Sequence, residues 1–283
     1  MAAPRATAEW LFATLFSSPW LSRATGRLCD LRLPPALQVR VIRAYARAFR
    51  VDLTEAAHPP EAYSSFNAFF TRPLVHGCRP VDRTAGTVVS PCDARVSGIG
   101  PVPADGRLEQ VKGLTYSVEA LLGSAIDASL FRGGMQATLY LSPSMYHRVH
   151  SPVDGCIRAW RYVPGRLFPV NGPAVRAIPG LFTRNERVCL FYETEAHGPV
   201  AVVMVGAANV GRISLSFAPL TTNRGAQPGT VRPEAPVPVQ RGDEIGAFNL
   251  GSTVVVLLAD PALAPADVLG EVVRMGRPLW KRR

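Results

Sequence analysis

Two stripes of apolar side chains recur at helical spacing within residues 1–56. Steps of three and four residues place such side chains on one face of a helix. Arginines alternate with the second stripe, so the helix it predicts has one apolar and one basic face. Such a helix can lie on an anionic membrane or pack one face on a protein core. The first stripe comprises Trp10, Leu11, Phe12, Leu15 and Phe16, and the second comprises Val39, Ile42, Tyr45, Ala46 and Phe49, with Arg40, Arg43, Arg47 and Arg50 between them.

The pattern changes after residue 62. An aromatic-rich segment at 64–73 predicts a short helix that ends before Pro73, because proline cannot continue a helix. From Val81 onward, short apolar runs alternate with glycine and proline, which is typical of strands joined by turns. A last helix is expected at 264–275. The expected strands cover residues 87–89, 136–141, 188–192, 200–205, 212–217 and 253–258.

These elements predict an α+β protein, with N-terminal amphipathic helices followed by a β-rich domain of sandwich or barrel-like form. We expect residues 1–62 to be a helical, membrane-contacting region and residues 63–283 to form the β-rich domain. Similar turns at 90–96, 151–157 and 239–246 resemble those of biotinyl and lipoyl sandwich domains. This likeness concerns the fold and does not specify a function.

Composition narrows the class of partner. The chain has 283 residues, of which 47% are hydrophobic and 18% charged, so it can bury a substantial core. Its formal net charge is +10 and its pI is about 10.0. The expected partner is therefore anionic: a nucleic acid, a phosphate or a membrane surface.

The same composition argues against several other classes. Five cysteines, none in a C-x-x-C pair, argue against a disulfide scaffold or a zinc ribbon. The stretches 10–22 and 245–259 lack charged side chains but are shorter than a membrane span, so no transmembrane helix is expected. Glu9 precedes the first apolar patch, and we expect no signal peptide.

Four groups of residues could carry chemistry, one of them the polar cluster at 181–187, whose two arginines could bind phosphate or carboxylate or simply lie in a solvated loop. His147 and His150 lie three residues apart in Tyr146-His147-Arg148-Val149-His150, and histidine is the side chain best suited to proton transfer near neutral pH. Gly251 and Ser252 precede an apolar strand, where the serine hydroxyl could attack the preceding carbonyl if a base removes its proton. Asp93, which could also form a simple turn, could orient a histidine.

Taken together, the motifs resemble the bacterial short type of the phosphatidylserine decarboxylase family. They follow one another in the order of that family from about residue 64 to residue 258. The matching pieces are Phe66-Asn67-x-Phe69-Phe70-x-Arg72-Pro73-Leu74, Ser90-Pro91-x-Asp93, Lys112-Gly113-x-x-Tyr116-Ser117, Tyr140-Leu141-Ser142-Pro143, Tyr146-His147-Arg148-Val149-His150, Tyr162-Val163-Pro164-Gly165, Leu181-Phe182-x-Arg184-Asn185-Glu186-Arg187-Val188, Val205-Gly206-Ala207 and Leu250-Gly251-Ser252-Thr253.

The resemblance implies a self-processing, pyruvoyl-dependent decarboxylase that converts phosphatidylserine to phosphatidylethanolamine. Cleavage between Gly251 and Ser252 would give a β chain, 1–251, and an α chain, 252–283, and Ser252 would become a pyruvoyl group that forms a Schiff base with the substrate. Asp93, His150 and Ser252 would form the processing set, with His150 as base and Asp93 as its orienter. His147 would serve decarboxylation, and His147 and Phe168 would contact the substrate.

The resemblance also implies partners and a location. The substrate would lie in an anionic membrane, and the protein would be peripheral on the cytoplasmic side of the cell membrane. The two chains would remain together as a heterodimer, which could in turn form a homo-oligomer. No nucleic acid and no metal ion is expected. Two positions depart from the family pattern: Ala94, where glycine is frequent, and Pro169, where a small polar residue is expected.

Three other functions compete with this interpretation. A lipoyl-like carrier would need an acceptor lysine, for which Lys112 is the only internal candidate. A zinc hydrolase would use His147 and His150, with Asp93 or His197 as a third ligand. A basic RNA-binding protein is the third, although no compact basic–aromatic platform is evident.

Overall fold

The structure is a computed structural model that describes residues 19–111, 113–208, 212–249 and 252–282. The first apolar stripe, at Trp10 to Phe16, and Lys112 therefore lie outside the described residues. The helices are α2 Pro19–Asp30, α3 Pro35–Phe49, the 3-10 helix η1 Pro60–Ala62, α4 Phe66–Phe70, α5 Val118–Leu122, α6 Ala125–Ser129, α7 Gly172–Ala177 and α8 Leu181–Arg184.

Strands are the main regular structure after residue 87, and neighbouring strands pair antiparallel. The strands are β1 Val88–Val89, β2 Ala94–Pro101, β3 Arg107–Val111, β4 Leu114–Ser117, β5 Met135–Leu141, β6 Arg148–His150, β7 Gly155–Val163, β8 Arg187–Thr194, β9 Gly198–Gly206, β10 Ile213–Leu215, β11 Gly229–Val231, β12 Val237–Val239, β13 Glu244–Phe248, β14 Ser252–Leu258, β15 Leu263–Pro265, β16 Val272–Val273 and β17 Pro278–Arg282.

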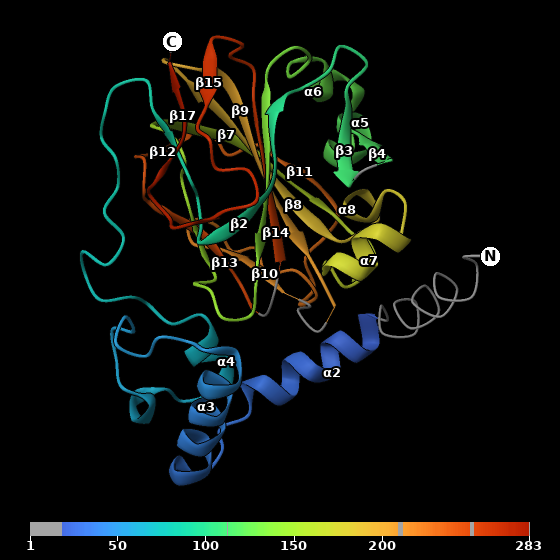
Figure 1. The fold of residues 1–283 in the computed structure, drawn as a ribbon. Helices are drawn as coiled ribbons and strands as arrows, with labels where there is room; N and C mark the ends of the chain where they lie inside the picture. The colour runs from blue at the N-terminus through green and yellow to red at the C-terminus, as the bar shows by residue number, and fades with distance from the viewer. Residues whose placement is uncertain (1–18, 112, 209–211, 250–251, 283) are drawn as a thin grey trace, which may run out of the picture.

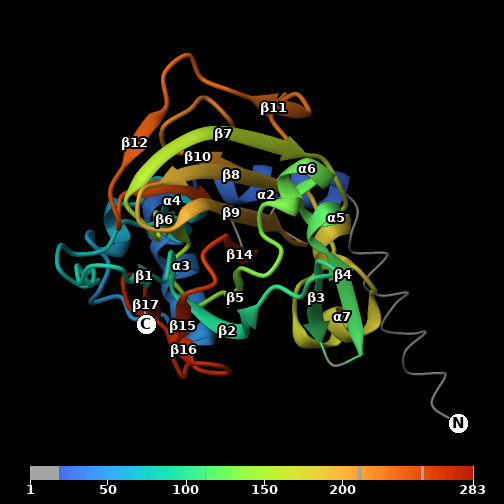
Figure 2. The same cartoon turned by 90° about the horizontal axis from the view of Figure 1, so that it is seen from above.

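One large sheet organises the molecule, with the strand order β11-β7-β8-β9-β14-β5-β2-β16. Two smaller sheets, β10-β13-β6 and β1-β17-β15, pack on one side, and the β3–β4 hairpin with α5 to α8 packs on the other (Figures 1 and 2). Each side of the large sheet buries its own apolar cluster. The expected α+β class with a β-rich domain is confirmed.

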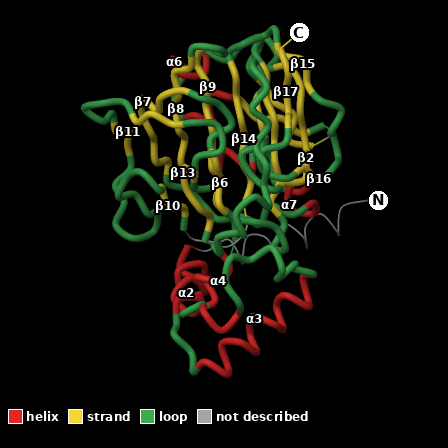
Figure 3. Tube along the Cα trace, turned by 90° about the vertical axis from the view of Figure 1, so that its left-hand side faces the viewer, coloured by secondary structure: helices red, strands yellow, loops and turns green. Residues whose placement is uncertain are grey.

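The helices α2, α3 and α4 lie together at one end of the sheets (Figures 1 and 3). Pro35 opens α3, where its missing N–H costs nothing, and the chain leaves the helix at Arg50 in a left-handed conformation with φ of 57°. Ile42 and Ala46 bury one face of α3 in a small cluster that also contains Tyr63 and Phe69. This cluster joins residues from both sides of the expected 62/63 boundary, which stays a prediction.

The six strands expected from the sequence are all present, with ends shifted by one or two residues. The short aromatic helix before Pro73 is also confirmed as α4, which Ser65 caps by accepting a hydrogen bond from the Ala68 N–H at 3.1 Å. The helix expected at 264–275 is wrong, because this segment contains β15 and β16. Pro265 and Gly270 interrupt it, and its strands gain backbone partners in β17 and β2.

Candidate active site

Ser252 is the first residue of β14, the strand at the centre of the large sheet. It lies between Leu141 of β5 and Gly206 of β9. Its side chain is 0% exposed, and its hydroxyl has no hydrogen-bond partner among the described residues. Leaving a buried hydroxyl without a hydrogen-bond partner lowers the stability of a fold by about 1 to 3 kcal/mol. The Ser252 hydroxyl is therefore available for a contact with another group.

The scissile bond expected from the sequence lies just before this strand. Leu250 and Gly251 are outside the described residues, so the cleavage position predicted there stays a prediction. Asn249, the last described residue before them, accepts a hydrogen bond at Oδ1 from the Asn67 amide at 3.0 Å. Its own N–H donates to the Arg212 carbonyl at 3.0 Å. The chain entering the candidate site is thus held by α4 on one side and by the Arg212 backbone on the other.

His147 is fully buried beside Phe248, the last residue of β13, after which the chain continues to Ser252. Its carbonyl accepts from the Phe248 N–H at 2.9 Å, and its ring lies 4.1 Å from the Phe70 ring centroid. Nδ1 lies 2.8 Å from the Met145 carbonyl, which can only accept, so Nδ1 carries the proton. Nε2 therefore has a free lone pair, buried and without a partner among the described residues.

His150 has a different environment, although it follows His147 by only three residues. Its Nδ1 donates to the Gly242 carbonyl at 2.8 Å, which leaves Nε2 to accept from the Tyr146 hydroxyl at 3.0 Å. Its backbone partner in β13 is Glu244. Glu244 lies four residues before Phe248, whose N–H binds the His147 carbonyl, and four residues span about 13 Å along a strand. The register therefore brings His147, rather than His150, to the end of β13 that leads to Ser252.

Burial keeps both rings neutral near pH 7. It lowers the pKa of His147 to about 3, and the nearby charge of Arg72 acts in the same direction. Burial also lowers the pKa of His150, but the Gly242 carbonyl and the negative charges of Glu244 and Asp93 oppose this effect. A proton is therefore less costly on His150 than on His147.

Asp93 is 6% exposed and interacts with an arginine rather than with a histidine ring. Its carboxylate accepts from Arg79 at 2.8 and 2.6 Å and from the Met275 N–H at 2.9 Å. Arg79 in turn donates to Glu55 at 2.8 Å. The described contacts of the His150 ring do not include Asp93, so the carboxylate influences His150 through its charge and not through a direct hydrogen bond.

Phe168 is tied to the strand beside Ser252. Its N–H donates to Asn185 Oδ1 at 2.9 Å, and its carbonyl accepts from Asn185 Nδ2 at 2.9 Å. The same Nδ2 donates to the carbonyl of Gly206, the strand partner of Ser252, at 2.8 Å. Asn185 is fully buried and thus fixes the Phe168 backbone relative to the residue opposite Ser252.

The two departures from the family pattern cause no backbone strain here. Ala94 begins β2, and it is not among the described non-glycine residues with positive φ, which are Arg50 and Asn223. Its methyl group is therefore compatible with the extended backbone at this position. Pro169 directly follows Phe168, whose own N–H and carbonyl provide the hydrogen bonds to Asn185.

The described residues contain no cluster of three or more His, Cys, Asp or Glu side chains able to hold a metal ion. His197 lies in the turn between β8 and β9, with Nδ1 3.3 Å from Asp260 Oδ2. The structure therefore does not bring His197 and the two histidines of the motif together as a ligand set.

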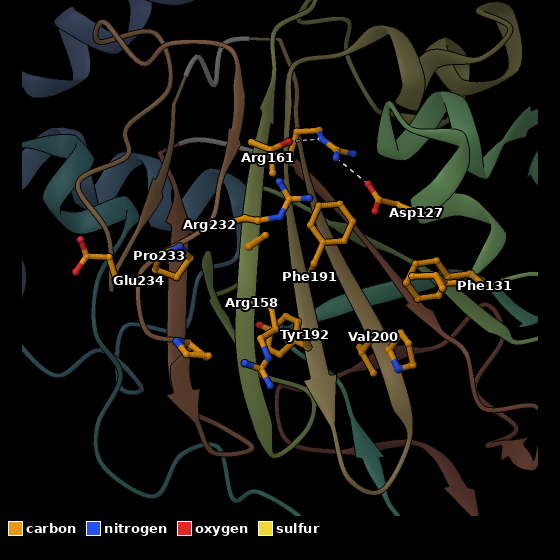
Figure 4. A pocket seen from close by; sticks show the side chains of 15 residues that line it. Asp127, Phe131, Arg158, Arg161, Phe191, Tyr192, Val200, Arg232, Pro233 and Glu234 are labelled. Atoms are coloured by element: carbon orange, nitrogen blue, oxygen red, sulfur yellow. Dashed lines mark hydrogen bonds and ion pairs between the residues drawn. The ribbon is translucent and has the colours of Figure 1, made fainter.

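Two cavities flank the large sheet at different distances from Ser252. One, of about 540 Å³, contacts Arg95, Tyr140, Val170, Arg176, Phe182 and Thr253. Figure 4 shows the other, of about 420 Å³, where the Arg161 and Arg232 side chains point toward the Phe191 ring and Arg161 pairs with Asp127 at 2.7 Å. The first is lined by Thr253, the residue after Ser252, whereas the second is lined by Val200, the partner of Leu258 at the far end of β14.

The sequence model of the phosphatidylserine decarboxylase family matches residues 66–281, a range that contains Asp93, His147, His150, Phe168 and Ser252. The chain belongs to the phosphatidylserine decarboxylase family.

Two bacterial relatives of this family match nearly the whole chain. The phosphatidylserine decarboxylase proenzyme of Anaeromyxobacter sp. (strain K) is 45% identical over 268 residues, covering 92% of this chain and 93% of the relative. The proenzyme of Stutzerimonas stutzeri (strain A1501) is 43% identical over 267 residues, covering 92% and 89%.

In this phosphatidylserine decarboxylase family member, the structure also shows contacts at the candidate site for which the sequence assigned no role. Tyr146 and Arg79 are the partners of His150 and Asp93, and Asn185 holds Phe168. Glu186 is a buried carboxylate whose oxygens accept from Thr222 at 2.6 Å and Tyr162 at 3.0 Å, and burial raises its pKa. Tyr146 stands in the same motif as His150, whereas Arg79, Asn185 and Glu186 have partners 14 to 36 positions away, which a local sequence pattern does not reveal.

Proposed function

We propose that this protein is a self-processing, pyruvoyl-dependent decarboxylase that converts phosphatidylserine to phosphatidylethanolamine. The observation that carries the proposal is the Ser252 hydroxyl, buried and unpartnered at the first residue of the central strand of a phosphatidylserine decarboxylase family member. A serine that only shaped a turn would be expected to hydrogen-bond to its own backbone or to water.

Self-processing needs a nucleophile, a base and a leaving group. Ser252 Oγ attacks the Gly251 carbonyl carbon, and the peptide bond is replaced by an ester while the nitrogen of residue 252 becomes a free amine. A base then removes the proton on Cα of residue 252, and the Gly251 carboxylate leaves as the new C-terminus. The resulting dehydroalanine tautomerises to an imine, and water hydrolyses it to the pyruvoyl group and ammonia.

We propose His150, assisted by Asp93, as the base that deprotonates Ser252. A base must accept a proton, and although burial lowers the pKa of His150, the Gly242 carbonyl and the charges of Glu244 and Asp93 favour its protonated form. His147 has the free Nε2 and the position nearer to Ser252, but burial and Arg72 strongly oppose its protonation. The proton path from Ser252 to His150 would include the Tyr146 hydroxyl, which already contacts His150 Nε2.

In the processed enzyme, residue 252 would be the N-terminus of β14, fixed by β5 and β9 on both sides. The pyruvoyl group supplies a ketone for the amine of the substrate and accepts the electrons released with CO₂. His147 would contact the substrate, and a proton taken up at its Nε2 would pass readily to the product carbon, because burial disfavours keeping that proton on the ring. Phe168 would line the site, since Asn185 fixes it beside Gly206.

We propose that α2 and α3 bring this site to the membrane surface, with the protein peripheral on the cytoplasmic side. Five large apolar side chains of this region are exposed: Leu28, Leu31, Leu37, Val41 and Phe49. Exposed arginines accompany them on α3, which suits a surface of anionic lipids. None of the described helices is long and apolar enough to cross a bilayer.

Intact mass spectrometry of freshly expressed protein tests the proposed function. We expect two chains, residues 1–251 and a 32-residue chain that begins at position 252 with a pyruvoyl group instead of serine. We expect Ser252→Ala to remain one chain, and His150→Ala and Asp93→Ala to be cut slowly or not at all. A base is typically worth about 100-fold to 10,000-fold in rate.

A matched variant separates processing from turnover. We expect His147→Ala to be cut at the normal rate but to form phosphatidylethanolamine weakly. An uncut wild-type chain would refute the proposed function. Normal cleavage of His150→Ala together with no cleavage of His147→Ala would exchange the roles of the two histidines.

A further inference from the structure

Arg72 is a buried arginine that forms no ion pair with the described residues, although the charges of Asp93 and Glu55 act on it from a distance. It lies two residues after the end of α4, the residue is 3% exposed, and its Nε has no hydrogen-bond partner among the described residues. Among the described residues, no ion pair or hydrogen bond involves its guanidinium group, whose central carbon lies 5.1 Å from the Phe69 ring centroid. A buried charge that is neither paired nor hydrogen-bonded destabilises the fold, so such a charge is rare in proteins unless it serves a function.

The other buried arginines each have an ion pair or several hydrogen bonds, although the Nε of Arg241 also has no partner. Arg187 donates to four backbone carbonyls, those of Ala120, Leu121, Thr183 and Asn185. Arg241 pairs with Asp154, and Arg212 pairs with Asp30. Unlike these three, the Arg72 guanidinium has several N–H donors in one plane but no hydrogen-bond acceptor for them among the described residues.

Arg72 also lies at the candidate active site. Phe70, two residues earlier, packs on the ring of His147, and the charge of Arg72 contributes to the lowered pKa of that ring. Asn67, on the same short helix, holds Asn249 ahead of the scissile bond. The unpaired guanidinium is therefore within electrostatic reach of the groups that we propose act on the substrate.

The head group of the proposed substrate carries two anions, a carboxylate and a phosphodiester. The carboxylate leaves as CO₂, and a desolvated arginine bound to it would stabilise the ground state more than the transition state and slow the reaction. The phosphodiester keeps its charge from substrate to product. Only three atoms separate its phosphorus from the reacting amine, so a group that binds it must lie close to residue 252.

We propose that Arg72 binds the phosphodiester of the phospholipid head group and so distinguishes a phospholipid from other serine derivatives. This inference rests on the proposed function. Guanidinium and phosphate can form two parallel hydrogen bonds, which would satisfy Arg72 and fix the head group beside His147. The conservative replacement, lysine, would keep the charge but lose this paired geometry.

Two soluble inhibitors of phosphatidylserine turnover separate the two anions. Glycerophosphoethanolamine has the phosphodiester but no carboxylate, whereas O-methylserine has the carboxylate but no phosphodiester. For processed Arg72→Gln, we expect the inhibition constant of glycerophosphoethanolamine to rise about 10- to 100-fold, the loss typical of a charge-assisted hydrogen bond. The constant for O-methylserine should stay within about threefold of the wild-type value, a change of less than 1 kcal/mol.

Arg158→Gln is the matched control, because Arg158 is an exposed arginine that pairs with Glu193 at the remote cavity of Figure 4. It should leave both inhibition constants unchanged. Arg72→Lys should be processed and show a smaller rise for glycerophosphoethanolamine, and it replaces Arg72→Gln if the glutamine variant is not cut.

Three results would overturn the inference. These are a wild-type enzyme that glycerophosphoethanolamine does not inhibit, Arg72 variants with both constants unchanged, and Arg72 variants in which O-methylserine alone binds more weakly. Loss of the proposed function would appear separately, as a wild-type chain that is neither cut nor active.

Discussion

His147 and His150 show how much a side chain's chemistry depends on its neighbours. Each donates Nδ1–H to a carbonyl, yet Nε2 of His150 meets the Tyr146 hydroxyl while Nε2 of His147 meets no described partner. Arg72 and burial make protonation of His147 costly, while Asp93 and Glu244 partly relieve that cost for His150. The two rings are therefore suited to different steps, although the motif presents them as equivalents.

The buried neutral ring of His147 should make folding sensitive to pH. Its pKa is about 3 in the folded chain and about 6.5 when unfolded, so below pH 6.5 the unfolded chain binds a proton that the folded chain does not. The contribution is fully present above pH 6.5 and is lost as the pH falls toward 3. Between pH 7 and 5.5, the free energy of unfolding should fall by about 1 kcal/mol on account of this residue.

Urea denaturation of uncut protein measures this effect. In the Ser252→Ala background, His147→Gln should show the smaller fall in unfolding free energy between these pH values. His150 is present in both proteins, so its contribution cancels. Equal falls would mean that His147 is readily protonated in the folded chain, and the lowered pKa would be wrong.

At the scale of elements, α3 divides its apolar stripe between two environments. Ile42 and Ala46 are buried in the cluster with Tyr63 and Phe69, whereas Phe49 is 45% exposed. The sequence left open whether this stripe faces a protein core or a membrane. The structure gives the stripe both buried and exposed members, which suits a helix that is anchored to the protein and available to a lipid surface.

Arg40 and Arg47, both exposed on α3, should strengthen binding to anionic membranes. Replacing both with glutamine should weaken binding to phosphatidylserine-containing vesicles by about 30-fold, given about 1 kcal/mol for each charge near the surface. Vesicle co-sedimentation measures the affinity, and the difference should shrink at high salt.

The double variant Arg158→Gln/Arg232→Gln removes the same charge from the face shown in Figure 4 and should bind nearly as well as the wild type. If this control weakens binding equally, the attraction comes from net charge and not from α3.

At the scale of the whole molecule, β14 connects the proposed α chain to the rest of the fold. All seven of its residues are buried, and each pairs with β5 on one side and β9 on the other. The last strand, β17, pairs with β1 and thereby holds the end of the α chain to the β chain as well. Cleavage before Ser252 would leave all of these contacts intact.

We therefore expect the two chains to stay together after cleavage. In native buffer the 32-residue α chain should co-elute with the β chain in size-exclusion chromatography, with or without a reducing agent, because all five cysteines are free. Denaturant should separate them. Release of the short chain in native buffer would show that the central strand does not hold it.

Much of this architecture follows from sequence alone. Alternation of short apolar runs with glycine and proline predicted the strands, because a buried strand needs apolar side chains at nearly every position. Pro73 predicted where the short helix α4 ends, because helix breaking by proline acts over a few residues. The ordered motifs led to the correct family. The incorrect helix at 264–275 shows the limit, since local apolar spacing did not reveal that the segment pairs with β2 and β17.

The tertiary structure alone determined the contacts between residues that lie far apart in the sequence. Asn67 meets Asn249 across 182 positions, and Asp93 meets Arg79 and the Met275 N–H instead of His150. The unpaired charge of Arg72 is likewise visible only once its surroundings are known. The physical reason is that sequence determines which groups a chain possesses and how each prefers to fold locally. Hydrogen bonding, burial and pKa depend on which other groups the packed chain brings within a few ångströms.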